Sequence, residues 1–259
     1  MIFVIDVGNT NTVMGVYQGS TLVQNWRVRT EQNATEDEFH VLISNLFAMH
    51  AIDPGVFTRT VISCVVPPMM TILDAFCRKY LGHSPIWVDA RNCAAMPILY
   101  DNPAEVGADR IVNAVGAYDK YRTSMIIIDF GTATTFDAIS ERGEYLGGAI
   151  SPGIQIASEA LFQKASKLPR VDILKPPETV VGKNTISSIK AGIIYGYAGL
   201  VDGMVRRMAS EMGGAPKVIA TGGLAPLMKD VAATIEYVES ALTLEGLRII
   251  SEATDATAL

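Results

Sequence analysis

The sequence has few cysteines and no close pair of them. Its 259 residues include only Cys64, Cys77 and Cys93, and no two of these form a Cys-x-x-Cys motif. An odd number of separated cysteines argues against both a disulfide framework and a zinc knuckle. We therefore expect the chain to work in a reducing, cytoplasmic setting.

Histidine is scarce as well. The three histidines are His40, His50 and His83, and the first two fall in a segment with the periodicity of an amphipathic helix. We interpret all three as structural or surface residues. A histidine-based metal site is not expected.

Long apolar runs and an excess of positive charge are also missing. No window reaches the roughly 18 uninterrupted apolar residues of a membrane helix, and the N-terminal apolar run ends at Asp6 with no basic residue before it. The 21 basic and 27 acidic side chains give a net charge of −6, which disfavours a broad surface for nucleic acid. We expect small-molecule or protein partners, with no nucleic acid and no membrane.

Hydrophobic residues, in contrast, are abundant. They make up 49% of the 259 residues, which is enough to bury the cores of two modest domains of roughly 100 to 150 residues each.

The first half alternates strands and helices in the order βββαβαβ. Thr35 and Glu38 have the spacing of a capping box, which predicts the start of the first helix. We expect the apolar face of that helix to contain Phe39, Leu42, Ile43, Leu46 and Phe47. The predicted strands are residues 2–7, 11–18, 21–29, 60–66 and 85–89, and the helices are residues 35–50 and 67–82.

The second half begins again with three strands. The stretches "MIIIDF", "TTFDAIS" and "YLGGAI" are predicted strands, followed by helices at residues 154–167 and 186–212. An apolar strand "KVIATGG", a helix, a short strand "IEYVE" and a terminal helix complete the half. We place the boundary between Tyr121 and Ser124, which gives domains of residues 1–121 and 122–259 that meet along a cleft.

A similar polar hairpin sequence occurs once in each half. "DVGNTNT" follows the first strand, and "DFGTATT" follows the first strand of the second half. Gly-Asn and Asn-Thr pairs are ordinary hairpin residues, but the repetition favours a site. Aligned without a gap, the pairs are Asp6 with Asp129, Gly8 with Gly131, Asn9 with Thr132, Asn11 with Thr134, and Thr12 with Thr135.

Two such hairpins suit a nucleoside triphosphate. Backbone N–H groups and Thr or Asn side chains can hydrogen-bond phosphate oxygens, and glycine lets the backbone approach closely. Asp6 and Asp129 stand where a carboxylate can hold Mg²⁺, directly or through its water shell. The sequence has no G-x-x-x-x-G-K-S/T run, so it is not a P-loop protein. Gly222 and Gly223 offer a flat backbone surface for an adenine or ribose.

The segment "GADR" precedes a helix with an apolar face. Asp109 and Arg110 stand near the start of that helix. Taken by themselves, these residues fit a structural role, in which Asp109 favours the helix N-terminus and Arg110 pairs with a neighbouring acid.

Four glycines lie on one face of the long helix predicted at residues 186–212. Gly192, Gly196, Gly199 and Gly203 are spaced four, three and four residues apart. A glycine inside a helix lowers helix stability by about 1 kcal/mol relative to alanine. Four glycines on one face therefore predict a close contact that compensates for this loss. Two explanations of this contact are possible. The glycines could pack against the chain's own sheet, or they could form a closely crossed helix pair in a homodimer.

The ordered motifs "DVGNTNT", "GADR", "DFGTATT" and "TGG" resemble those of the type III pantothenate kinases, within the superfamily of acetate and sugar kinases, Hsp70 and actin. The resemblance covers Ile2 to about Leu247. It implies an α/β fold of two duplicated ribonuclease H-like (actin-like ATPase) domains, each with a mixed five-stranded sheet and flanking helices. It also implies phosphorylation of pantothenate by ATP, the first step of coenzyme A synthesis, in a homodimer that requires Mg²⁺ and a monovalent cation, K⁺ or NH₄⁺.

The resemblance also assigns roles to residues. Asp109 would be the base for the substrate hydroxyl, Arg110 would bind the pantothenate carboxylate, and Asp129 would hold the monovalent cation. Tyr100 matches a substrate-binding tyrosine, although a core tyrosine fits as well. Other substrate contacts would come from Gly107, Ala108 and, across the dimer, Asn184 or Thr185. The ATP and phosphate contacts would be Asp6 (also Mg²⁺ through water), Val7, Gly8, Asn9, Thr10, Asn11, Thr12, Val13, Gly131, Thr132, Thr134, Gly222 and Gly223.

Three rival interpretations remain at this stage. A kinase of the same fold could act on another small hydroxy acid, although "GADR" argues against it. A nucleotide-binding regulator of transcription would not need a carboxylate such as Asp109 at an acceptor site. An actin-like or chaperone-like ATPase would need a longer chain than 259 residues.

Overall fold

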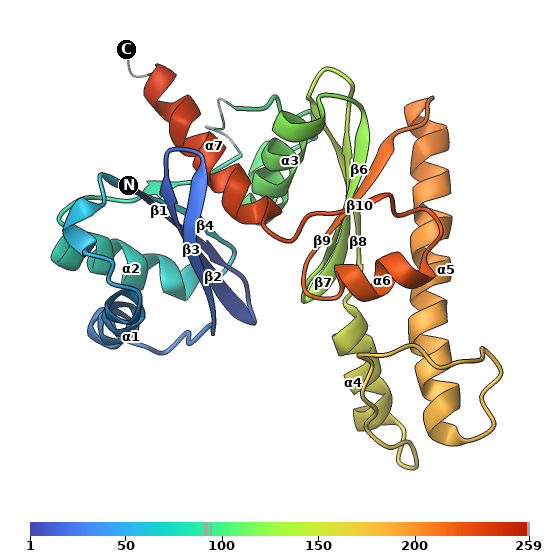
Figure 1. Ribbon diagram of the computed structural model, residues 1–259. Coiled ribbons are helices and arrows are strands. Elements are labelled where there is room, and N and C mark those ends of the chain that lie inside the picture. Colours follow the sequence, from blue (N-terminus) through green and yellow to red (C-terminus); the bar gives the residue numbers. More distant parts are fainter. Residues whose placement is uncertain (91–92, 94, 258–259) are drawn as a thin grey trace. The chain divides into compact units, whose positions relative to one another are not determined.

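The computed structural model describes residues 1–90, 93 and 95–257. The chain divides into two compact units (Figure 1). The first contains Met1–Asp119 and the segment from Leu242 onward, and the second is Lys120–Ala241. The sequence-based division at residues 121 and 122 assigned the terminal helix to the second domain, whereas this helix groups with the first unit.

The first unit is built on a five-stranded mixed sheet in the order β3-β2-β1-β4-β5. β1 pairs antiparallel with β2 and parallel with β4, so the carboxyl ends of β1 and β4 lie at the same edge of the sheet. The strands are β1 (Ile2–Val7), β2 (Asn11–Gln18), β3 (Thr21–Arg29), β4 (Arg59–Cys64) and β5 (Ile86–Trp87). The three predicted opening strands are confirmed residue by residue.

One face of this sheet packs against two helices. Phe39, Ile43 and Phe47 of the first helix are buried there. The predicted capping box is present, since Thr35 and Glu38 exchange both of its hydrogen bonds. Leu42 differs from the expectation because it is 40% exposed. The helices are α1 (Glu36–Met49), η1 (Pro54–Val56), α2 (Pro67–Phe76) and the π-helical η2 (Cys77–Leu81).

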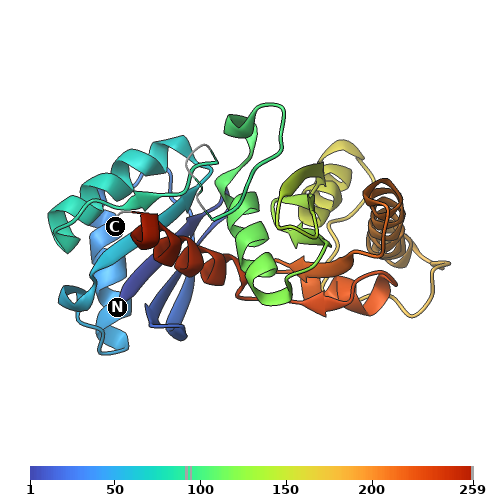
Figure 2. The same cartoon turned by 90° about the horizontal axis from the view of Figure 1, so that it is seen from above.

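The opposite face is covered by one helix, which a second helix crosses closely. α7 (Leu242–Thr257) contacts β1, β2 and β4 and runs along the sheet (Figure 2). α3 (Ala108–Tyr121), preceded by η3 (Pro103–Glu105), meets α7 at two glycines. A β-carbon on Gly116 would stand 2.8 Å from the Leu242 carbonyl oxygen, and one on Gly246 would overlap the Val112 carbonyl oxygen. The missing side chains therefore let the two backbones touch.

The second unit repeats the arrangement. Its mixed sheet has the order β10-β9-β6-β7-β8, so the predicted pair of five-stranded sheets with flanking helices is confirmed. Its core joins β6, β7 and β9 to α4, α5 and α6, and α5 continues beyond the sheet beside α4 (Figure 1). The elements are β6 (Met125–Phe130), β7 (Ala133–Ile139), β8 (Tyr145–Pro152), α4 (Ile154–Lys164), α5 (Thr185–Met212), β9 (Lys217–Thr221), α6 (Ala225–Val231) and β10 (Tyr237–Val238).

The glycine face of α5 makes no close contact with other parts of the described chain. A β-carbon built on Gly192, Gly196, Gly199 or Gly203 meets no heavy atom within 4 Å among the described residues. Packing against the chain's own sheet, one of the two interpretations of these glycines, is therefore wrong.

None of the helices in the described part of the chain combines the length and the hydropathy that crossing a membrane requires. The three cysteines are free thiols. Each histidine has a structural contact, as expected: His50 with Gln24, His40 with Ser44, and His83 with Thr60.

Candidate active site

Asp6 lies at the carboxyl end of β1, in the middle of the first sheet. It stands opposite Val13 of β2 and opposite Ser63 of β4. Ligands of open α/β sheets bind outside the carboxyl ends of the strands. Asp6 is therefore positioned at the sheet edge where this type of fold binds ligands.

Cys64 lies beside Asp6 at this edge. Its Sγ donates to the Val66 carbonyl oxygen at 3.2 Å. Burial raises the pKa of the Cys64 thiol, and the negative charge of Asp6 adds to the rise. The thiol is therefore kept neutral next to the carboxylate.

The first hairpin projects from the same edge and is held by backbone hydrogen bonds. Gly8 N–H donates to the Asn11 carbonyl oxygen at 3.0 Å, which closes the turn. Asn9, Thr10 and Asn11 are exposed at the tip. The exposed polar backbone of this tip is suited to an anionic ligand.

The two hairpins differ by one residue, which corrects the ungapped alignment. Val7 pairs with Thr12 in the first hairpin, whereas Phe130 pairs with Thr134 in the second. Thr12 is therefore equivalent to Thr134, not to Thr135. The pairing register reveals this because the second turn is one residue shorter, and no alignment without a gap could reproduce it. Both threonines are buried, with 1% and 0% exposure.

The tip of the second hairpin packs on the start of α4. Gly131 N–H donates to the Ala133 carbonyl oxygen at 3.0 Å. A β-carbon on Gly153 would overlap the Thr132 carbonyl oxygen, so only glycine fits beneath the tip. Thr134 Oγ1 is buried and has no hydrogen-bond partner among the described residues, which leaves a hydroxyl available to a bound group.

Asp129 lies at the carboxyl end of β6, against the glycine pair. It stands opposite Thr221 of β9. Gly222, which follows β9, has φ of 91°, and a β-carbon there would stand 2.6 Å from Asp129 Oδ1. Gly222 is therefore required for its backbone conformation and for space beside the carboxylate.

Gly107 and Asp109 form a compact turn at the start of α3. Arg110 N–H donates to the Gly107 carbonyl oxygen at 3.1 Å and to Asp109 Oδ1 at 2.9 Å. Burial raises the pKa of the Asp109 carboxyl, while the Arg110 N–H and the Arg110 charge oppose the rise. Asp109 thus lies in the first turn of α3, as the structural interpretation expected, and the hydrogen bond from Arg110 N–H holds its carboxylate in place.

This turn lies beside the carboxyl end of β4. A β-carbon on Gly107 would be 3.7 Å from Val65 Cγ1, and Val65 N–H donates to the Val7 carbonyl oxygen at 3.1 Å. "GADR" and the first hairpin therefore lie at the same edge of one sheet, although about 100 residues separate Asp6 from Asp109 in the sequence.

The remaining substrate candidates differ in burial. Arg110 is 6% exposed and Ala108 is 9% exposed. Tyr100 is partly exposed, so it is not a core tyrosine. Val7 is buried and Val13 is partly exposed in the strands that flank the first turn.

Asn184 and Thr185 start α5 in the second unit. Asn184 Oδ1 accepts from Ser187 N–H at 2.9 Å and caps the helix. Both residues are exposed and line a depression of about 690 Å³ with Lys183, Ser188 and Gly192. The depression therefore joins these two residues to the glycine face of α5.

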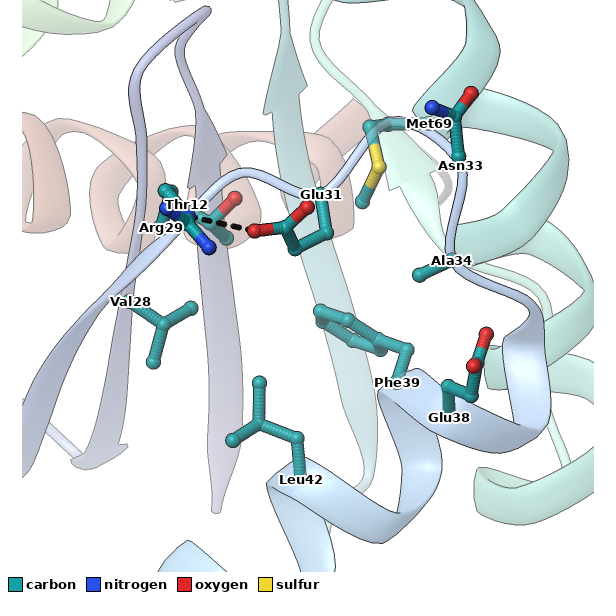
Figure 3. A pocket seen from close by; sticks show the side chains of 10 residues that line it. All are labelled: Thr12, Val28, Arg29, Glu31, Asn33, Ala34, Glu38, Phe39, Leu42 and Met69. Atoms are coloured by element: carbon teal, nitrogen blue, oxygen red, sulfur yellow. Dashed lines mark hydrogen bonds and ion pairs between the residues drawn. The ribbon is translucent and has the colours of Figure 1, made fainter.

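A second hollow, of about 320 Å³, lies between the end of β3, the segment that follows it and α1 (Figure 3). Thr12 lines it together with Val28, Phe39 and Leu42, and the Arg29–Glu31 ion pair borders it at 2.6 Å. This hollow explains why Leu42 is exposed despite its place on the apolar side of α1.

The side chains at the two strand ends that could bind a cation offer oxygen atoms as ligands. The described residues contain no cluster of three or more His, Cys, Asp or Glu side chains that could hold a metal ion. Asp6 and Asp129 each offer a carboxylate, the ligand type preferred by hard cations. Each residue thus fits a cation that completes its coordination with water or phosphate oxygens.

Sequence reasoning missed three residues at these edges. Thr30 contacts the first hairpin, Gly153 supports the second, and Ser63 lies opposite Asp6 with a buried hydroxyl that has no hydrogen-bond partner in the described structure. A polar residue near the end of an apolar strand is a weak signal that could have pointed to Ser63, whereas Thr30 follows the alternating strand β3 and gives no such signal.

Comparison with known proteins identifies close relatives. The family model of type III pantothenate kinase matches residues 2–207. A type III pantothenate kinase of Desulfatibacillum aliphaticivorans is 68% identical over 250 residues, which cover 96% of this chain and 97% of the relative.

Solved structures are similar in fold. Component A of (R)-2-hydroxyglutaryl-CoA dehydratase from Acidaminococcus fermentans superimposes with a TM-score of 0.59 at 15% identity, over 100% of both chains. A Baf family protein of Campylobacter jejuni, described as a transcriptional activator, gives a TM-score of 0.58 at 15% identity, over 98% of this chain and 99% of that one. At this identity the likeness concerns the fold alone.

Proposed function

Because the chain belongs to the type III pantothenate kinase family, which phosphorylates pantothenate with ATP in coenzyme A biosynthesis, we propose a role in that reaction for each predicted site residue. The protein is a phosphotransferase, and its product is 4'-phosphopantothenate. The observation that carries the assignments is that Asp109 and the first hairpin lie at one edge of one sheet.

Asp109 is proposed as the base that accepts the proton of the pantothenate hydroxyl. Phosphoryl transfer passes through a loose transition state, so the base needs position more than strength. The hydrogen bond from Arg110 N–H to Asp109 Oδ1 fixes that position. The other carboxylate oxygen, Oδ2, is assigned to the substrate hydroxyl.

Arg110 is proposed to bind the pantothenate carboxylate. Its planar guanidinium can hold a carboxylate bidentately, which orients the substrate and directs its hydroxyl. The burial of Arg110 supports this role, since the attraction between a guanidinium and a carboxylate is stronger where water is excluded. Tyr100, Gly107 and Ala108 are the other proposed contacts of pantothenate in this chain.

The hairpins are proposed to bind the phosphates of ATP. In the first hairpin the contacts are assigned to Val7, Gly8, Asn9, Thr10, Asn11, Thr12 and Val13. In the second unit they are assigned to Gly131, Thr132 and Thr134, with Gly222 and Gly223 beneath the nucleoside. The support is the exposed polar tips and the buried Thr134 hydroxyl.

Asp6 is proposed to hold Mg²⁺ through a water molecule, and Asp129 to hold K⁺ or NH₄⁺. Bound cations would neutralise the phosphate charge during transfer. The carboxylates of this chain position those cations, and Gly222 keeps the space beside Asp129 open.

The enzyme is proposed to be a cytoplasmic homodimer that binds neither nucleic acid nor membrane. The contact-free glycine face of α5 supports a close helix pair, and the net charge of −6 supports the expected absence of nucleic acid. In the α5 region, Thr185 is the better candidate for the partner's pantothenate pocket because Asn184 Oδ1 already caps the helix. We also propose that the two structural units are the functional domains.

The Arg110→Gln variant tests the substrate assignment. It should raise the KM for pantothenate by about 10- to 100-fold, corresponding to loss of a charge-assisted hydrogen bond, and leave the KM for ATP within about twofold. The exposed Arg142→Gln is the matched control. An unchanged KM for pantothenate in a folded Arg110→Gln protein would contradict the assignment.

A further inference from the structure

Thr30 follows β3 and contacts the first hairpin at three places. Its Oγ1 donates to the Gly8 carbonyl oxygen at 2.7 Å. Its N–H donates to the Thr10 carbonyl oxygen at 3.1 Å. Its Oγ1 also lies 3.0 Å from Thr12 Oγ1. Thr30 therefore contacts the beginning of the turn at Gly8, its tip at Thr10 and its end at Thr12.

These contacts determine where the N–H groups of the turn point. A trans peptide holds its C=O and N–H on opposite sides. Because the carbonyl groups of Gly8 and Thr10 point to Thr30, the N–H groups of Asn9 and Asn11 point away from β3. Two donors are thereby aimed in one general direction at the exposed tip.

We propose that Thr30 is a positioning residue for ATP, and that it presents the Asn9 and Asn11 N–H groups to phosphate oxygens. Thr30 is 9% exposed and acts through the backbone of the turn without touching the nucleotide. Preorganised donors bind developing charge without a cost of reorganisation at the moment of reaction. This inference rests on the proposed role of the first hairpin in phosphate binding.

The hydroxyl is the part of Thr30 that matters. Valine has the same shape but cannot donate to the Gly8 carbonyl oxygen, whereas serine keeps the donor and loses only a methyl group. The backbone bond to Thr10 persists in both variants. The pair Thr30→Val and Thr30→Ser therefore isolates the two hydrogen bonds of the Thr30 hydroxyl, to the Gly8 carbonyl oxygen and to Thr12 Oγ1.

The test is steady-state kinetics of the full chain with ATP and pantothenate varied separately. Thr30→Val should raise the KM for ATP by about tenfold, equivalent to about 1.4 kcal/mol, and leave the KM for pantothenate within about twofold. Thr30→Ser should restore the KM for ATP to within about twofold of the native value.

Thr60→Val is the matched control. Thr60 is also a buried threonine of the first unit, with its Oγ1 2.9 Å from His83 Nε2, and it does not contact the hairpin among the described residues. This variant should lower the melting temperature while leaving the KM for ATP unchanged. An equal rise in the KM for ATP in Thr60→Val and Thr30→Val would contradict the positioning role and show that Thr30 has only a structural role.

The Asp6→Asn variant separates failure of this inference from failure of the proposed function. If Asp6→Asn impairs turnover but Thr30→Val leaves the KM for ATP unchanged, the positioning role is wrong and the hairpin assignment stands. If neither variant changes kinetics with ATP, the hairpin does not bind phosphate and both claims fall. Should Thr30→Val fail to fold, Thr30→Ser decides, because a raised KM for ATP in a folded serine variant overturns the proposal.

Discussion

The carboxylate of Asp109 lies over the α-carbon of Gly107. A β-carbon on Gly107 would stand 2.5 Å from Asp109 Oδ1, a separation that two such atoms do not adopt. The same oxygen accepts from Arg110 N–H at 2.9 Å. The absent side chain of Gly107 and the backbone of the helix together set where the carboxylate stands.

The Gly107→Ala variant should therefore displace the proposed base. We expect kcat to fall by roughly 10- to 100-fold, the range in which small misplacements of reacting groups act, with little change in the KM for ATP. Gly214→Ala is the control, since no heavy atom of the described residues lies within 4 Å of that added carbon. Native kcat in Gly107→Ala would mean that the carboxylate position is not critical.

The pH dependence of the reaction should reflect the environment of Asp109. Burial raises the pKa of its carboxyl, and a base must be ionised to accept a proton. The acidic limb of kcat/KM for pantothenate should thus have an apparent pKa above the ordinary value of about 3.9. A limb at or below that value would contradict this assignment.

The same shift affects stability with a defined sign. A carboxyl whose pKa is raised by folding binds more protons in the folded state, so its contribution to the free energy of unfolding falls as pH rises from the ordinary pKa through the folded pKa. Asp109→Asn removes the unfavourable burial of the ionised carboxylate at neutral pH. Its melting temperature should therefore be no lower than that of the native protein, as checked by calorimetry.

The Gly222→Ala variant should disturb the proposed cation site. Its φ of 91° strains alanine by about 1–3 kcal/mol, and its β-carbon would press on Asp129 Oδ1. We expect a lower free energy of unfolding and a higher K⁺ concentration for half-maximal activity. Gly213→Ala, with φ of 73° and open space around it, should show the strain alone. An equal K⁺ response in both variants would argue against Asp129 as the cation ligand.

The Gly196→Leu variant should break the proposed dimer. Leucine costs less than glycine within a helix, and within the described chain the added side chain meets open space at its β-carbon. The isolated subunit should remain folded, while sedimentation velocity should show a shift towards monomer. Gly214→Leu, at another exposed glycine, should leave the association unchanged. A native sedimentation profile for Gly196→Leu would contradict the helix-pair interface.

Local signals predicted much of this fold, and distant contacts explain the rest. The alternation of β1 to β3 and the Thr35–Glu38 capping box depend on residues a few positions apart, and both are confirmed. The apolar period of α7 indicates a buried face but not the sheet that covers it, so its return to the first sheet was missed. The Thr30–Gly8 hydrogen bond joins residues 22 positions apart, and sequence spacing gives no sign of it.

The central claim is that Asp109 is the base of a pantothenate kinase, and ADP release tests it most directly. Purified protein with ATP, Mg²⁺ and K⁺ should release ADP when pantothenate is added. Asp109→Asn should bind ATP normally but lose this release by about 10²- to 10⁴-fold. Pantothenate-dependent release at the native rate in Asp109→Asn would contradict the claim.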